Sequence, residues 1–158
     1  MEKVTSKDGT QIAYDRQGTG PALILVDGAL CYRSFGPMPG LAQLLASNFT
    51  IYYYDRRGRG ESGDTKPYAV EREVEDIEAL INEAGGSVYI CGLSSGAALA
   101  LEAAIKLDGK IKKLAMYEAP YAADDAAQQA AKEYNRQLTE RLAEGRRGDA
   151  VGEPQSHA

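Results

Sequence analysis

The residues best suited to chemistry form one short stretch, Gly92-Leu93-Ser94-Ser95-Gly96. It follows residues 87–91, an apolar run with strand character, and precedes residues 97–105, a run typical of a buried helix. A serine at the apex of a strand-turn-helix unit is held in strained backbone geometry with its hydroxyl exposed. The pattern predicts that Ser94 is a nucleophile for acyl transfer. The alternative is a glycine-lined turn whose serine is idle.

A second chemical feature is expected at the end of an earlier strand. Residues 22–26 are all apolar, as in a central parallel strand that is covered on both faces. The run leads directly into Asp27-Gly28-Ala29, where the glycine lets the backbone turn its N–H groups toward a ligand. We expect the N–H groups of Ala29 and Ser95 to form an oxyanion hole beside the serine hydroxyl.

Residues 55–63 form a third distinctive stretch, which contains three glycines and three arginines. Such a loop could bind phosphate, but the helix that a phosphate-binding loop opens does not follow at once. We therefore favour a structural loop in which Asp55 and the arginines pair with one another.

Hydrophobic periodicity predicts the elements that position these residues. Asp8-Gly9 indicates a hairpin between strands at 2–6 and 10–16. Apolar residues spaced as on one helix face predict an amphipathic helix that begins at Val70 and reaches Ile81. The remaining elements expected are helices at 41–46 and 124–144 and strands at 49–54 and 111–117. Alternating strands and helices predict an α/β fold with a mostly parallel sheet.

Composition and charge exclude several classes of partner. The chain of 158 residues is long enough for one domain with a core, and its net charge of -5 argues against nucleic acid or an anionic membrane as partner. No apolar run is long enough to span a bilayer, and the N-terminus lacks the apolar core of a secretion signal. We therefore expect a cytoplasmic protein.

The cysteines and the histidine give little sign of a metal site. Cys31 and Cys91 form neither a disulfide framework nor a metal-ligand pattern. We expect them to be small buried side chains, the alternative being a thiol at the edge of the active site. The chain contains one histidine, His157. No metal and no cofactor are expected.

Taken in order, these motifs resemble the N-terminal part of the α/β-hydrolase fold. The closest likeness is to its esterase and haloperoxidase-like members, which carry a similar D-x-R-G-x-G-x-S loop. The likeness covers residues 1 to about 120. Asp27 departs from the family pattern, because most members have histidine before this glycine. We expect that change to affect side-chain hydrogen bonds more than the backbone donors.

The resemblance also implies what lies beyond the sixth strand. The family fold continues through two further strands and a final helix, which carry the acid and the catalytic histidine. We therefore expect a truncated core at 1–122, a cap-region helix at 123–147 and a disordered tail at 148–158. Glu118 follows the sixth strand, where some members place their acid, or else it is an exposed or loop-capping carboxylate. His157 is the single candidate base, or else a mobile tail residue.

Two functions follow from these residues. The first is a carboxylesterase-like serine hydrolase that acts on small esters through Ser94, impaired by the missing C-terminal histidine. The second is a hydrolase-like scaffold without catalysis. In either case the outer edge of the sixth strand is expected to be unpaired, and an unpaired edge invites association. We therefore predict a homodimer or higher oligomer.

Overall fold

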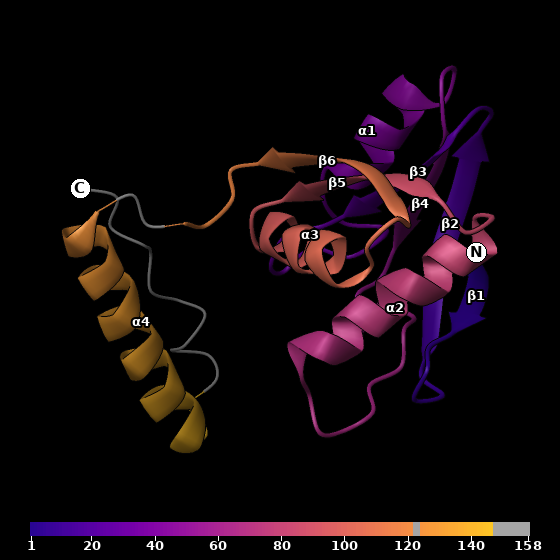
Figure 1. Ribbon diagram of the computed structural model, residues 1–158. Coiled ribbons are helices and arrows are strands. Elements are labelled where there is room, and N and C mark those ends of the chain that lie inside the picture. Colours follow the sequence, from indigo (N-terminus) through magenta and orange to yellow (C-terminus); the bar gives the residue numbers. More distant parts are fainter. Residues whose placement is uncertain (122–123, 147–158) are drawn as a thin grey trace. The chain divides into compact units, whose positions relative to one another are not determined.

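The computed structural model describes residues 1–121 and 124–146 (Figure 1). The chain divides into two compact units, Met1–Pro120 and Tyr121–Ala158. The predicted tail at 148–158, and His157 with it, lies outside the described residues. The first unit carries all the described strands and all of the candidate site that the structure describes, so each unit is taken separately below.

The first unit alternates strands and helices, as its hydrophobic pattern predicts. Its strands are β1 (Glu2–Thr5), β2 (Gln11–Gly18), β3 (Ala22–Val26), β4 (Thr50–Tyr54), β5 (Val88–Leu93) and β6 (Ile111–Tyr117). Its helices are α1 (Met38–Leu45), α2 (Val70–Glu83) and α3 (Ser95–Lys106). α1 begins three residues before the predicted start, because Pro37 at its N-cap and Pro39 in its first turn both fit a helix start.

The strands form one six-stranded sheet in the order β1-β2-β4-β3-β5-β6. β1 pairs with β2 and β2 with β4 in antiparallel fashion, while β4, β3, β5 and β6 run parallel to one another. The predicted α/β class with a mostly parallel sheet is therefore confirmed. In a parallel sheet the carboxyl ends of the strands meet at one edge, so the ends of β3, β4 and β5 bring the three predicted motifs together.

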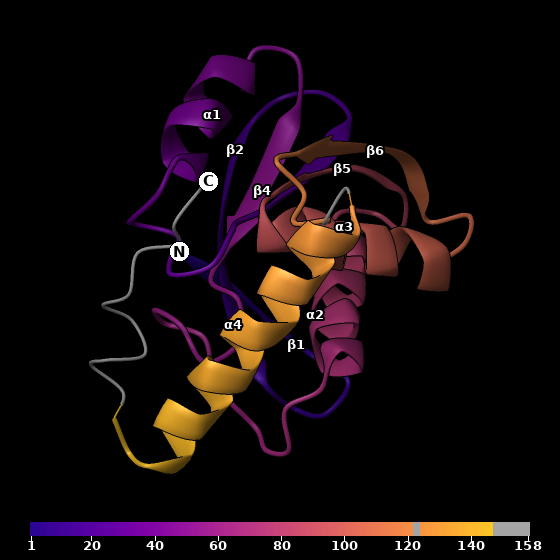
Figure 2. The same cartoon turned by 90° about the vertical axis from the view of Figure 1, so that its left-hand side faces the viewer.

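Helices cover both faces of the sheet, as Figure 2 shows. α2 and α3 pack on one face over a cluster that includes Ile12, Ile24, Ile77 and Ile90, each at most 1% exposed. α1 packs on the other face, where Met38 and other buried side chains from α1, β3 and β4 form a smaller cluster. Burial on both faces explains why β3 is apolar throughout.

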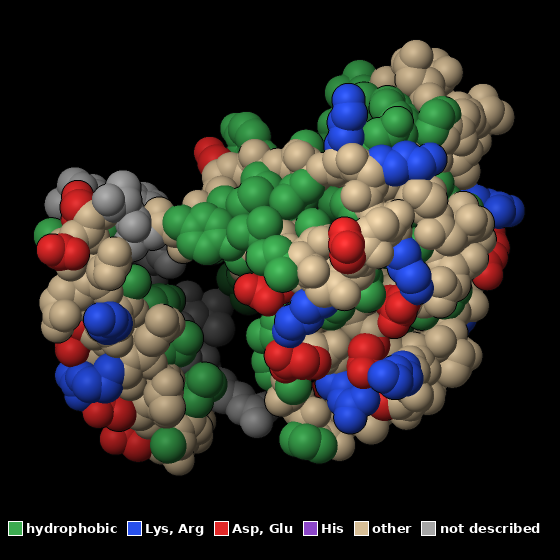
Figure 3. All heavy atoms as spheres, viewed as in Figure 1, with side chains coloured by type: hydrophobic (Ala, Val, Ile, Leu, Met, Phe, Trp, Pro, Cys, Tyr) green, Lys and Arg blue, Asp and Glu red, His purple; other side chains and the backbone are tan. Residues whose placement is uncertain are grey.

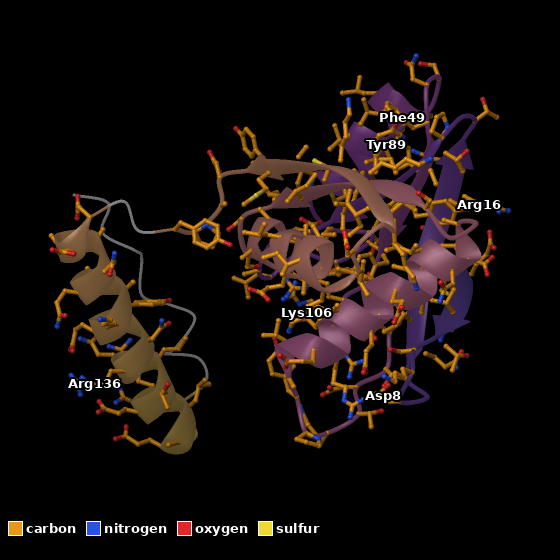
Figure 4. All side chains as sticks on the ribbon, in the orientation of Figure 1. Asp8, Arg16, Phe49, Tyr89, Lys106 and Arg136 are labelled. Carbon is orange, nitrogen blue, oxygen red and sulfur yellow. The ribbon has the colours of Figure 1, made fainter. Side chains whose placement is uncertain are left out.

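The α1 face is covered unevenly from strand to strand. Tyr89 on β5 packs edge-on against Phe49, which precedes β4, with 5.9 Å between the ring centroids (Figure 4). Beyond Tyr89 the cover thins, since Cys91 and Leu93 on the same face of β5 remain partly exposed. The β5 side chains that face α2 and α3, by contrast, are buried.

β6 lies at an edge of the sheet. It pairs with β5 on one side and with no other strand of the described residues on the other. Met116 is 38% exposed and Tyr117 is 62% exposed. Figure 3 shows hydrophobic side chains gathered around the end of this strand. An exposed edge that ends in apolar residues is the feature that the sequence predicts here.

The second unit contains α4 (Asp125–Ala143), which matches the helix expected at 124–144. The carboxylate of Asp124 caps the helix by accepting a hydrogen bond from the N–H of Ala127 at 2.8 Å. None of the described residues of α4 is buried. No described helix of the chain is both long enough and apolar enough to cross a membrane.

Candidate active site

Ser94 lies at the apex of the turn between β5 and α3. Its backbone has φ 53° and ψ -123°, in the left-handed region that costs energy for a residue with a Cβ atom. The N–H of Ser94 donates to the carbonyl of Tyr117 at 2.9 Å, which ties the apex to the end of β6. The side chain is partly exposed, so the hydroxyl can meet a substrate.

The two glycines of the turn are required by close backbone contacts. A Cβ at Gly92 would lie 2.4 Å from the carbonyl oxygen of Gly96 and 2.5 Å from the Cα of Ala97. A Cβ at Gly96 would lie 2.3 Å from the carbonyl oxygen of Val26. The start of α3 therefore lies in close backbone contact with the ends of both β5 and β3. This is the chain crossing that the glycine spacing predicts.

The loop after β3 lies against the serine. A Cβ at Gly28 would lie 3.4 Å from the Cβ of Ser94 and 3.3 Å from the carbonyl oxygen of Leu93. The N–H of Gly28 is occupied, because it donates to Oδ1 of Asp27 at 2.8 Å. The next N–H along the chain belongs to Ala29, the predicted first oxyanion donor. The predicted second donor, Ser95, is the first residue of α3, where N–H groups lack helical acceptors.

Backbone strain is concentrated around this serine. In the described residues, three residues other than glycine have left-handed φ: Leu30, Ser94 and Glu118. They belong to the loop over the serine, to the apex itself and to the end of β6. Strained residues that cluster in this way mark functional sites more often than ordinary turns.

The arginine-rich loop at 55–63 is structural, but its pairing differs from the prediction. The expected pairing of Asp55 with the arginines of its own loop is wrong. Asp55 instead accepts from the backbone N–H of Glu61 at 2.8 Å and lies 3.6 Å from Nε of Arg33. The reason is that α2 supplies closer carboxylates to the first two arginines of the loop.

Two carboxylates of α2 hold those arginines. Arg56 binds Glu73 through two hydrogen bonds of 2.6 and 2.7 Å, and Arg57 binds Asp76 through two of 2.7 and 2.8 Å. All four side chains are nearly buried. Arg57 also binds Asp8 in the hairpin turn at 2.9 Å. Carboxylates thus occupy two of the three arginines of the loop, which supports the structural interpretation over phosphate binding.

The loop at 55–63 also reaches the residues around the serine. Nη1 of Arg56 donates to the carbonyl of Asp27 at 3.3 Å and to Oγ of Ser95 at 3.2 Å. Nη1 of Arg59 donates to the carbonyls of Gly28 at 2.7 Å and Cys31 at 3.3 Å. These contacts were not predicted from the sequence. The only signal for them was the density of arginine and glycine in one short stretch.

Burial shifts the titration of two groups under the loop. Burial raises the pKa of the Asp27 carboxyl above its ordinary value, despite the hydrogen bond from the Gly28 N–H. Burial and then the charge of Asp27 raise the pKa of the Cys31 thiol, and burial raises that of Cys91. Both cysteines are only partly buried. A thiol is activated by a lowered pKa, so these shifts do not support the alternative of a reactive thiol at the edge of the active site.

The structure describes the predicted acid, Glu118, but not the predicted base, His157. Glu118 follows directly on Tyr117, whose carbonyl accepts the N–H of the serine, and it is exposed with φ 49°. His157 lies outside the described residues. The structure therefore brings together Ser94, Ser95 and the Ala29 loop, and it leaves the Glu118 side chain exposed after the end of β6. Among the described residues no cluster of histidine, cysteine and acidic side chains could hold a metal ion.

Comparison with known families decides what this arrangement belongs to. The model of the alpha/beta hydrolase family matches residues 13–155. The chain belongs to this family. The match runs further along the chain than the likeness seen in its motifs, which covered residues 1 to about 120. The order of the motifs and the serine at a strand-to-helix turn agree with that membership.

Individual members of the family are similar over most of the chain. A crystal structure of an alpha/beta hydrolase from Sphaerobacter thermophilus is 52% identical, with a TM-score of 0.82, over 95% of this chain and 57% of that one. A thermophilic esterase from Thermogutta terrifontis is 26% identical, with a TM-score of 0.71, over 89% of this chain and 52% of that one.

A curated sequence relative gives the same picture. A pimeloyl-[acyl-carrier protein] methyl ester esterase from Stenotrophomonas maltophilia is 39% identical over 104 residues, which are 65% of this chain and 37% of that protein. The chain thus spans between about a third and three fifths of the length of these relatives.

Proposed function

We propose that this α/β hydrolase transfers the acyl group of small carboxylic esters to Ser94 and then to water. The observation that carries the proposal is the strained Ser94 at the tip of β5, held by the carbonyl of Tyr117 and covered by the Gly28 loop. Two of the similar proteins, from Thermogutta terrifontis and Stenotrophomonas maltophilia, are esterases. They support an ester as the substrate.

In the proposed reaction Oγ of Ser94 attacks the ester carbonyl carbon, and a base takes the hydroxyl proton. The carbonyl oxygen becomes an oxyanion that accepts from the N–H groups of Ala29 and Ser95. The carbon–oxygen bond to the alcohol then breaks, and the alcohol leaves with the proton. Water, deprotonated by the same base, hydrolyses the acyl-serine ester and restores the hydroxyl.

The base must have a pKa near neutrality, which favours an imidazole. His157 is the single histidine of the chain and is the proposed base, with Glu118 as the acid that would orient it. If His157 is the base, its loss stops both acylation and deacylation. A serine without a base keeps only the rate that the oxyanion hole and binding provide.

The proposal is tested with p-nitrophenyl acetate and the full chain. We expect the wild type to release p-nitrophenol and to carry an acetyl group on the peptide that contains Ser94, detected by mass spectrometry. Ser94→Ala and His157→Ala should both reduce release to the level of buffer. Ser47→Ala is the control, because it removes an exposed hydroxyl that bonds Asn48 just before β4, at the end of the parallel strands away from Ser94.

Two outcomes of that experiment count against the proposal. Release that persists in Ser94→Ala would show that another group reacts with the ester. A wild type that matches buffer and carries no acetyl group would show that the serine is inactive in this chain. Loss in Ser94→Ala but not in His157→Ala would keep the nucleophile and remove His157 as the base.

A second candidate function is a self-associating scaffold, favoured by the bare edge of β6. The bond from Ser94 to the carbonyl of Tyr117 points that carbonyl toward β5, so by strand alternation the N–H and C=O of Leu114 and Met116 point outward. Two β6 strands paired antiparallel about Ala115 would place Leu114 opposite Met116. The same register would bring Lys112 of one copy near Glu118 of the other.

That pairing makes a test by charge exchange possible. We expect the wild type to elute as a dimer in size-exclusion chromatography with light scattering. Glu118→Lys should weaken the dimer through like charges, and the double variant Lys112→Glu, Glu118→Lys should restore it. A compact monomer at every concentration would contradict the scaffold. A dimer insensitive to both variants would place the interface elsewhere.

A further inference from the structure

Arg59 stands apart from the other arginines of its loop. Arg56 and Arg57 each bind a carboxylate of α2 through two hydrogen bonds. Among the described residues Arg59 forms no ion pair, and it donates hydrogen bonds to two backbone carbonyls, those of Gly28 and Cys31. The shorter of these two hydrogen bonds, at 2.7 Å, is made to the carbonyl of Gly28, in the loop beside the candidate nucleophile.

This placement is unfavourable for the charge of Arg59. The side chain is partly buried, and burial, followed by the nearby charge of Arg56, lowers its pKa. The charges of Glu73 and Asp27 act in the opposite direction, but among the described residues no carboxylate hydrogen-bonds Arg59. Carbonyl oxygens offset the cost of withdrawing a cation from water only in part. A loop that needed only to be stable would be better served by a neutral donor at this position, so the charge calls for a functional explanation.

The geometry of the peptide group provides one. The carbonyl of Gly28 and the N–H of Ala29 belong to the same planar, trans peptide unit, so they point in opposite directions. When Arg59 holds the Gly28 oxygen, it also fixes the direction of the Ala29 N–H. The preceding N–H, that of Gly28, is taken by Asp27. The first N–H of the loop that is free to donate to an oxyanion is therefore that of Ala29, whose direction Arg59 fixes.

The charge adds a second effect to the orientation. A cation hydrogen-bonded to a carbonyl polarises the whole peptide unit, and a polarised unit has a stronger N–H donor at its other end. The polarisation acts on the oxyanion without direct contact between it and Arg59.

The second predicted donor is fixed from the same loop. Arg56, held by Glu73, bridges the carbonyl of Asp27 and Oγ of Ser95. The spacing between the two segments that carry the donors is thus set by a guanidinium buried beneath them. Arg56 and Arg59 act at different peptide units, so their effects can be separated by mutation.

We propose that Arg59 is the positioning residue of the oxyanion hole, which orients and polarises the Gly28–Ala29 peptide for transfer of an acyl or phosphonyl group to Ser94. The inference rests on the proposed function for its effect on rate. Its effect on the peptide itself can be measured without any reaction, so the two can fail separately.

The experiment compares the full-length wild type with Arg59→Gln, Arg59→Lys and a matched control, Arg72→Gln. The Arg72 side chain lies on α2, is 41% exposed and pairs with Glu75, so its change removes a guanidinium and keeps the backbone carbonyl that accepts from Arg57. One measurement is the rate at which an alkyl fluorophosphonate labels Ser94, followed by intact mass. The other is the amide 15N resonance of Ala29, which responds to the hydrogen bond on the preceding carbonyl.

The expected result is a graded loss. Deleting one oxyanion donor costs about 100- to 1000-fold, so misdirecting it in Arg59→Gln should slow labelling by about 10- to 100-fold. Arg59→Lys keeps the charge and one donor and should fall between Arg59→Gln and the wild type. The Ala29 resonance should move in Arg59→Gln and move less in Arg59→Lys. Arg72→Gln should match the wild type in both measurements.

The two measurements separate the inference from the proposed function. If the wild type labels at Ser94 while Arg59→Gln labels equally fast, or if its Ala29 resonance stays in place, the inference is overturned. If the wild type does not label at all, the proposed function fails and the resonance alone decides. A shift of Ala29 in Arg59→Gln then still supports positioning by Arg59, and an unmoved resonance overturns it.

Discussion

The two sides of the candidate site are built differently. On the side of the loop at 55–63, two buried arginines are matched to carboxylates of α2, Arg57 to Asp76 and Arg56 to Glu73. On the side of β6, the strand edge is bare and Tyr117 is 62% exposed. Ser94 lies between the two sides. The loop after β3, predicted to carry the first oxyanion donor, thus rests on buried and paired charges, while Glu118 follows an exposed strand edge.

The largest effect should come from breaking the buried support. Asp76→Asn leaves the Arg57 guanidinium, 1% exposed, without its principal counter-charge. Removing one partner of a buried ion pair costs about 3–5 kcal/mol, because the remaining charge stays out of water. We expect the free energy of unfolding, measured by urea denaturation followed by circular dichroism, to fall by that amount.

The matched control for that variant lies on α4. Arg136 pairs with Glu133 and Glu140 at short distances, but all three side chains are about half exposed. Arg136→Gln should leave the unfolding transition unchanged, since exposed ion pairs are screened by water and salt. Equal effects of the two variants would contradict the contrast between the buried and the exposed pairs.

A smaller loss of stability is expected where α3 contacts the end of β3 at Gly96. In Gly96→Ala the new Cβ would meet the carbonyl oxygens of Val26 at 2.3 Å and Asp27 at 2.5 Å, both backbone atoms that cannot rotate away. Overpacking of this kind costs about 1–3 kcal/mol. Gly40→Ala in α1 meets nothing within 4 Å and should stabilise the helix by about 0.5–1 kcal/mol. Thermal unfolding of the pair measures both, and a stable Gly96→Ala would contradict the tight crossing.

The contrast between the two sides also separates what the sequence could predict from what it could not. Local patterns predicted the elements, because apolar spacing around Ile77 and the turn at Asp8-Gly9 act over a few residues. The turn at Ser94 was also local, since Gly92 and Gly96 lie within the motif. The partners of Arg56 and Arg57 were missed, because Glu73 and Asp76 become neighbours only when α2 docks.

The strand order shows the same limit. β4 lies between β2 and β3, an arrangement that no local pattern encodes. Asp27 was noted as a departure from the family, but its burial and its bond to Gly28 depend on the loop above it. Glu118 was placed correctly at the end of the sixth strand, while its left-handed backbone was not expected.

Low pH should lower the free energy of unfolding, because it protonates Asp8 and breaks its ion pair with Arg57. The hydrogen bond from the Arg57 guanidinium holds the pKa of Asp8 well below its ordinary value near 4. Between the two values the unfolded chain binds a proton that the folded chain does not, so stability rises with pH there and is lost as pH falls. Asp8→Asn should lower the free energy of unfolding at pH 7 by about 1 kcal/mol and flatten its fall below pH 4. An unchanged acid limb would contradict this role.

The smallest effect is expected at the edge of β6. Met116 is 38% exposed, so Met116→Ser gives up only part of the burial of a core side chain and should lower the free energy of unfolding by no more than about 1 kcal/mol in a dilute sample. Association alters this expectation, because a copy that covers the edge stabilises the fold by mass action. Unfolding measured at two protein concentrations therefore distinguishes the cases. If the wild type is more stable at the higher concentration and Met116→Ser is not, the exposed strand is an interface. If neither depends on concentration, the bare edge stays open to solvent, and the scaffold loses its support.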